Sequence, residues 1–298
     1  MFIKDKISYN LSKKRKMEKV IESFDGTKIY YQHEKGKRNK TLIFLHGIGS
    51  NWTVWKDSIN IFQKEGFSTI GIDLRGHGKS DWPEDFSFYK ISNFSRDIFE
   101  IVKKEGLSRF SFIGNSLGGA VAINYCRRYK KNTPLSMVLV ECAISYPFPH
   151  NRILNHSPYF TNVIRYIAEH DIIKEKHFLD YEIDFSKSSI IKNSHFLASI
   201  LSNTPFQTIV GTLDNIEKYI FKNKPGIIKT IKSLNIPILA IAGKKDEIIP
   251  VKFVQEIANL NPKIKIRILK NADHMVILKN PRIINKEINK FFLENKLI

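Results

Sequence analysis

A serine flanked by glycines is the first feature of this sequence that could do chemistry. Residues 114–119 read Gly-Asn-Ser-Leu-Gly-Gly, with an apolar run before them and an amphipathic stretch after them. Glycines two positions either side of Ser116 allow a strand and a helix to approach closely at a sharp turn, which exposes the serine hydroxyl. The helix also directs its N-terminal N–H groups at negative charge beside the turn. We therefore predict that Ser116 is a nucleophile.

A serine hydroxyl needs an adjacent base, which a carboxylate in turn holds in place. Asp246 and His274 each follow a buried apolar run, and the order along the chain is serine, aspartate, histidine. We expect His274 to act as the base and Asp246 to orient it. Glu141, at the end of another apolar run, is the alternative to Asp246.

The third requirement is a pair of donors for the oxyanion of a tetrahedral intermediate. We expect the backbone N–H groups of Leu117 and Ile48 to supply them, since Ile48 lies in the loop His-Gly-Ile-Gly that follows an apolar run. His46 in the same loop is an alternative base. The tentative substrate pocket contains His46, Trp52 and Asn115.

Elements that could position these residues recur along the chain. Residues 19–24 and 28–34 flank Asp25-Gly26 and predict an antiparallel hairpin. Continuous apolar runs predict buried strands at residues 41–45, 67–74, 110–114, 136–140, 236–242 and 263–269. Amphipathic stretches predict crossover helices at residues 91–104, 117–130, 251–260 and 283–293. The fold class is α/β, with a mostly parallel eight-stranded sheet and helices on both faces.

The alternation of strands and helices is interrupted after Cys142. About 90 residues separate one buried strand from the next, far more than a single crossover needs. We assign residues 19–142 and 236–298 to the core, residues 143–235 to a mainly helical cap, and residues 1–18 to a flexible basic extension. An insertion at the carboxyl end of a strand overhangs the edge where open α/β sheets bind ligands.

The net charge of +19 is spread along the chain, which argues against a nucleic-acid partner. No apolar run approaches the roughly 20 residues that span a bilayer, and the first residues lack a secretory signal. We expect a cytoplasmic monomer or dimer. The basic run Lys13–Lys16 allows weak contact with a membrane surface.

The sequence resembles the α/β-hydrolase superfamily, in its cap-bearing branch of serine esterases, lipases and carbon-carbon bond hydrolases. The resemblance rests on residues 46–49, the segment Asp-Leu-Arg-Gly-His-Gly-Lys-Ser at 73–80, the Ser116 turn, Asp246 and His274. It implies hydrolysis through an acyl-enzyme on Ser116 with no metal and no cofactor.

The resemblance also assigns Arg75 and His77 to scaffolding. Haloalkane dehalogenases and epoxide hydrolases of this fold carry an aspartate where this chain has Ser116. A small to medium carboxylic ester or a monoacylglycerol is the expected small-molecule substrate. The alternatives are cleavage of a carbon-carbon bond in a vinylogous diketone, for which Asn115 is a hint, cleavage of thioesters on a carrier protein, and a ligand-binding receptor.

Overall fold

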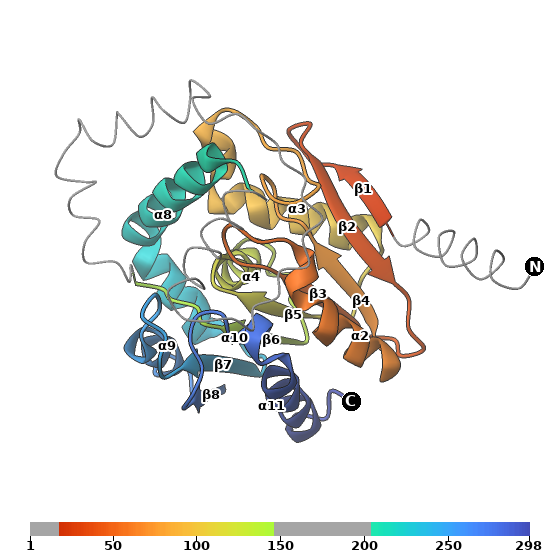
Figure 1. Ribbon diagram of the computed structural model, residues 1–298, viewed down its shortest axis with the longest axis vertical. Helices are drawn as coiled ribbons and strands as arrows, with labels where there is room; N and C mark the ends of the chain where they lie inside the picture. The colour runs from red at the N-terminus through yellow and green to blue at the C-terminus, as the bar shows by residue number, and fades with distance from the viewer. Residues whose placement is uncertain (1–17, 146–203) are drawn as a thin grey trace, which may run out of the picture.

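A mixed sheet forms the centre of the protein, whose computed structural model describes residues 18–145 and 204–298 (Figure 1). The strand order is β1-β2-β4-β3-β5-β6-β7-β8. The first two strands pair antiparallel with each other, β2 pairs antiparallel with β4, and the other pairs are parallel. The predicted eight-stranded, mostly parallel sheet is therefore confirmed.

The strands lie close to the predicted apolar runs. They are β1 (Glu18–Glu22), β2 (Lys28–Glu34), β3 (Thr41–Leu45), β4 (Ser68–Ile72), β5 (Phe110–Asn115), β6 (Ser136–Val140), β7 (Ile238–Gly243) and β8 (Ile264–Leu269). The first two strands form the predicted hairpin around Gly26, which has a φ of 84°. Glycine adopts this left-handed conformation without steric cost.

Two hydrophobic cores lie on opposite faces of the sheet, because successive side chains of a strand point to opposite faces. In β3, Leu42 and Phe44 pack into one core and Ile43 and Leu45 into the other. All five residues of β3 are buried. This burial on both faces explains why the strand is a continuous apolar run.

Helices cover both faces. On one face lie α3 (Ile91–Lys104), α4 (Leu117–Arg128), α8 (Phe206–Ser233) and α9 (Val251–Ala258). On the other lie α2 (Lys56–Lys64), α10 (Val276–Lys279) and α11 (Pro281–Glu294). The short 3-10 helix η1 (Trp52–Trp55) packs on this face as well. A second 3-10 helix, η2 (Phe86–Tyr89), precedes α3.

One edge of the sheet collects the loops that carry the predicted site. The parallel strands β3, β5, β6, β7 and β8 all end there, and their registers place Leu45 beside Gly114 and Asn115 beside Val140. Because parallel strands share a direction, segments that are far apart in the sequence follow one another along this edge.

The predicted cap is described only in part. Residues 146–203 lie outside the described residues, as do residues 1–17 of the predicted basic extension. The remainder of the cap is mostly the long helix α8, which packs against α4 and η2 and contains Pro225. No helix in the described part of the chain has the length and apolar character needed to cross a membrane.

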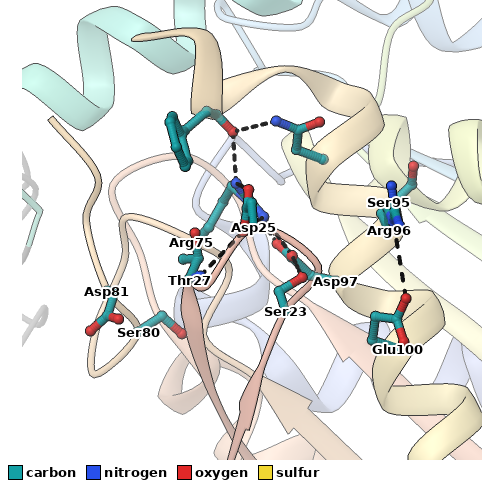
Figure 2. A network of polar contacts seen from close by, with 12 residues as sticks. Ser23, Asp25, Thr27, Arg75, Ser80, Asp81, Ser95, Arg96, Asp97 and Glu100 are labelled. Atoms are coloured by element: carbon teal, nitrogen blue, oxygen red, sulfur yellow. Dashed lines mark hydrogen bonds and ion pairs between the residues drawn. The ribbon is translucent and has the colours of Figure 1, made fainter. Parts of the chain in front are cut away.

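A buried ionic network joins the hairpin turn to the segment after β4 (Figure 2). The Arg75 guanidinium is fully buried and donates to both carboxylate oxygens of Asp97, at 2.7 and 2.6 Å. It also donates to Asp25 at 2.8 Å and to the carbonyl oxygen of Phe88 at 3.0 Å. Ser23 donates to Asp97. Arg75 therefore has the scaffolding role that the resemblance implies.

Replacing Asp97 with asparagine tests this network. Asp97→Asn leaves the buried guanidinium with one carboxylate, so we expect the free energy of unfolding to fall by about 3 kcal/mol. Glu100→Gln is the matched control on the same helix, because Glu100 pairs with an exposed Arg96 at 4.0 Å, and it should cost less than about 1 kcal/mol. Equal effects in urea unfolding would contradict the assignment.

Candidate active site

Ser116 lies at a strained turn between β5 and α4. Its φ of 48° and ψ of −110° are unusual for a residue other than glycine, and its N–H donates to the carbonyl oxygen of Val140 at 3.0 Å. A Cβ added to Gly114 would lie 2.7 Å from the backbone of Gly118, and one added to Gly118 would lie 2.3 Å from the carbonyl oxygen of Leu45. Only glycines permit these contacts, so the two glycines fix the turn that partly exposes Ser116.

The loop after β3 lies against this turn. A Cβ on Gly47 would lie 3.5 Å from the Cβ of Ser116 and 2.8 Å from the side-chain oxygen of Asn115. Ile48 follows Gly47, and Leu117 begins α4, where the first N–H groups of a helix have no intrahelical partner. The residues predicted to form the oxyanion hole therefore lie on the two segments that meet at Ser116.

His46 is fully buried beneath this loop. Its Nδ1 donates to the carbonyl oxygen of Gly47 at 2.7 Å, and its Nε2 accepts from the N–H of Leu74 at 3.0 Å. Burial holds the pKa of His46 well below its usual range, so the ring is neutral. Both ring nitrogens are occupied, and His46 holds the loop in place instead of offering a nitrogen to a base or pocket role.

The other two tentative pocket residues also contact the backbone or the sheet. The Asn115 side chain is only 6% exposed and donates to the carbonyl oxygen of Val140 at 3.2 Å. The Trp52 ring lies beside Gly71 of β4, where an added Cβ would be 3.2 Å from its Cε3. Their contact with a substrate stays a prediction.

His274 and Asp246 are brought together at the same edge, from the loops that follow β8 and β7. The Nδ1 of His274 lies 2.9 Å from Oδ2 of Asp246. The second oxygen of Asp246 accepts from the N–H groups of Ile248 and Ile249 at 2.9 and 2.8 Å. These two bonds stabilise the charge of the carboxylate and fix its orientation. The imidazole is 15% exposed, so its other nitrogen remains available for chemistry.

Asp273 shapes the turn that carries His274. Its Oδ1 accepts from the N–H of Met275 at 3.0 Å and its carbonyl oxygen accepts from the N–H of Val276 at 3.0 Å. Lys279 pairs with its second carboxylate oxygen. Asp273 thus stabilises the turn by bonds from its side chain to the backbone.

Glu141 is the site residue whose importance the sequence analysis understated. Its side chain is fully buried, and its Oε2 lies 3.7 Å from Nδ1 of His274. Burial and then the charges of Asp246 and Asp273 raise the pKa of Glu141 to about 10, so the group carries a proton at neutral pH. The only signal in the sequence is an acid directly after a buried apolar strand.

Glu141, Asp246 and His274 also have the donor types of a metal site. One ligand atom from each lies within 4.8 Å of the others. The Asp246 and His274 atoms are engaged with each other at 2.9 Å, and Asp246 is further bound by two backbone N–H groups. We therefore interpret the cluster as a hydrogen-bonded acid–histidine group.

The neutral state of Glu141 gives a testable dependence of stability on pH. The pKa of Glu141 is higher in the folded chain than the roughly 4.3 of an unfolded chain, so the wild type loses stability as pH rises from about 4.3 toward 10. Glu141→Gln removes this loss. We expect the free energy of unfolding of the variant, relative to that of the wild type, to increase between pH 5 and pH 8. The increase is at most about 1.4 kcal/mol per pH unit. Glu22→Gln, at an exposed position of β1, is the control; a gain that does not change with pH would refute the neutral assignment.

The chain is similar in sequence to known hydrolases. Residues 36–280 match the protein family described as Serine aminopeptidase, S33. Among curated proteins, the chain is 25% identical over 288 residues to Epoxide hydrolase 3 of Xenopus tropicalis, covering 92% of this chain and 77% of that protein. It is also 25% identical over 276 residues to Lipase 3 of a Moraxella species, covering 92% of this chain and 84% of that protein.

Solved structures show the same fold. An esterase from Exiguobacterium antarcticum superposes with a TM-score of 0.69 at 19% identity, covering 92% of this chain and 99% of that chain. A thermophilic esterase from Thermogutta terrifontis superposes with a TM-score of 0.70 at 21% identity, covering 93% and 98%. This chain is a hydrolase that belongs to the Serine aminopeptidase, S33 family of the α/β-hydrolase superfamily.

Proposed function

We propose that this protein is a serine hydrolase that cleaves a carboxylic ester through an acyl-enzyme on Ser116. The observation that carries the proposal is the 2.9 Å contact between His274 and Asp246 at the sheet edge where the strained Ser116 turn also lies. The names of similar proteins, a lipase and several esterases, support ester hydrolysis.

The proposed reaction begins with a proton transfer. The Nδ1–H of His274 donates to Asp246, which leaves Nε2 unprotonated and able to take the proton of Ser116. The serine oxygen then attacks the substrate carbonyl. The N–H groups of Ile48 and Leu117 hold the oxyanion, and each donor contributes about 3 kcal/mol to stabilising the transition state. The imidazolium returns its proton to the leaving alcohol.

Water completes the cycle. His274 removes a proton from a water molecule, which attacks the acyl carbon, and then returns that proton to the Ser116 oxygen as the carboxylic acid leaves. Asp246 stabilises the imidazolium in both halves of the reaction. Because two backbone N–H groups hold Asp246, the imidazole keeps one orientation through both steps.

The identity of the nucleophile favours esters over epoxides, although similar proteins include an epoxide hydrolase. A serine that opened an epoxide would form an ether, which has no carbonyl for water to attack, so the enzyme would stall. A serine that attacks an ester forms another ester, which water can hydrolyse. Ser116 therefore suits a carbonyl substrate.

For the substrate we propose a small to medium acyl ester or a monoacylglycerol. The hint of carbon-carbon cleavage came from Asn115, but the amide of Asn115 is buried and donates to the carbonyl oxygen of Val140. No contact of the described residues favours that alternative over an ester.

Hydrolysis of p-nitrophenyl esters with acyl chains of two to sixteen carbons tests the proposal. We expect a chain-length optimum in the wild type, and a loss of at least about 10⁴-fold in kcat/KM for Ser116→Ala, since the nucleophile is removed. Ser233→Ala, at the end of α8, is the matched control and should retain wild-type rates. Turnover by Ser116→Ala at the wild-type rate would exclude the acyl-enzyme.

A further inference from the structure

Glu141 is a buried acid that the reaction described above does not use. It follows the last residue of β6, and neither of its carboxyl oxygens has a hydrogen-bond partner of normal geometry among the described residues. The neighbouring Asn115 amide donates to the carbonyl oxygen of Val140 and also lies close enough to Glu141 to lower its pKa, against the larger effect of burial. Leaving a buried polar group without a partner costs about 1–3 kcal/mol, so the retention of an acid here requires an explanation.

The backbone of Glu141 and that of the neighbouring strand β7 place the Glu141 carboxyl beside His274. Glu141 has a φ of 50°, in the left-handed region that costs a residue with a side chain about 1–2 kcal/mol. Its N–H donates to the carbonyl oxygen of Ile241 at 2.8 Å, which fixes it to β7. Across from it, a Cβ on Gly243 would lie 2.5 Å from the carbonyl oxygen of Ala272 and 3.1 Å from Oε1 of Glu141, so a glycine leaves room for both.

Two carboxyl groups thus compete for one N–H. Nδ1 of His274 lies 2.9 Å from Asp246 and 3.7 Å from Glu141, and it carries a single proton. Asp246 is favoured, because two backbone N–H groups stabilise its charge. Glu141 has no such donors and remains neutral beside it. An approach of less than 1 Å would bring Glu141 into hydrogen-bond range of Nδ1.

We propose that Glu141 is a second positioning carboxyl for His274, held in reserve and able to accept the Nδ1–H bond when Asp246 does not. The inference rests on the proposed role of His274 as the base. If Asp246 loses its charge, the repulsion that adds to burial in raising the pKa of Glu141 disappears. When His274 then takes up a proton, the imidazolium 3.7 Å away favours the charged form of Glu141, which releases its proton to water and accepts the bond from Nδ1.

A double-mutant cycle in the full chain tests this role. Asp246→Asn alone should lose only about 10- to 100-fold in kcat/KM, well short of the roughly 10⁴-fold that loss of the orienting acid costs in a triad without a reserve. Adding Glu141→Gln to Asp246→Asn should remove at least a further ~10-fold. Adding Glu100→Gln instead, on the remote helix α3, should change nothing further.

A spectroscopic measurement on the same variants needs no turnover. The Nδ1 proton of His274, followed by NMR, should keep a low-field signal in Asp246→Asn and move upfield in Asp246→Asn/Glu141→Gln, because an amide oxygen accepts a weaker hydrogen bond than a carboxylate. Absence of ester turnover in the wild type would count against the proposed function, whereas this signal tests Glu141 independently. Identical signals and identical rates in the single and double variants would overturn the proposal.

A second variant guards against misfolding. Glutamine matches the neutral state of Glu141 in shape and should fold, which thermal unfolding checks. If Asp246→Asn/Glu141→Gln does not fold, Asp246→Asn/Glu141→Asp provides the same test, because a side chain shorter by one methylene cannot close the 3.7 Å gap. Retention of the Nδ1 signal in that variant would equally count against a reserve role.

Discussion

The close packing of α4 against β3 and β5 is the constraint on which the candidate site depends. Backbone meets backbone at Gly118 and Leu45, and only a residue without a Cβ fits there. This contact forces the chain through a left-handed conformation at Ser116, which partly exposes the residue at the end of a buried strand. The start of α4 and the loop after β3 meet at the same place, so one packing contact positions both the proposed nucleophile and the proposed oxyanion donors.

A series of polar contacts links the loop that carries Ile48 to the segment after β4. Arg75 is held by Asp97 and Asp25, which fixes the segment after β4. The N–H of Leu74 in that segment donates to His46, and His46 in turn donates to the carbonyl oxygen of Gly47. A buried ion pair is weak evidence of net stability. Here the Arg75 ion pairs have a geometric role, because they help to determine the position of the loop that carries the Ile48 N–H.

The electrostatics of the site depend on which carboxyl receives backbone donors. Asp246 accepts two N–H bonds and also contacts the imidazole. Glu141 lies in the same cluster without backbone donors, and burial raises its pKa to about 10. Glu141 therefore adds no second negative charge to the cluster at neutral pH. A single charge stabilises an imidazolium without adding the repulsion of a second buried carboxylate.

The sequence by itself determined the strands and helices, because burial on both faces leaves continuous apolar runs and helices leave a 3.6-residue period. The bounds of β3, β6 and α3 agree with the prediction. Local glycine spacing also located the Ser116 turn. Only the tertiary structure decided that Nε2 of His46 accepts a hydrogen bond from Leu74 and that the Glu141 carboxyl lies 3.7 Å from His274. Those contacts join segments brought together by strand register, and no local pattern encodes the distance between the ends of two neighbouring strands.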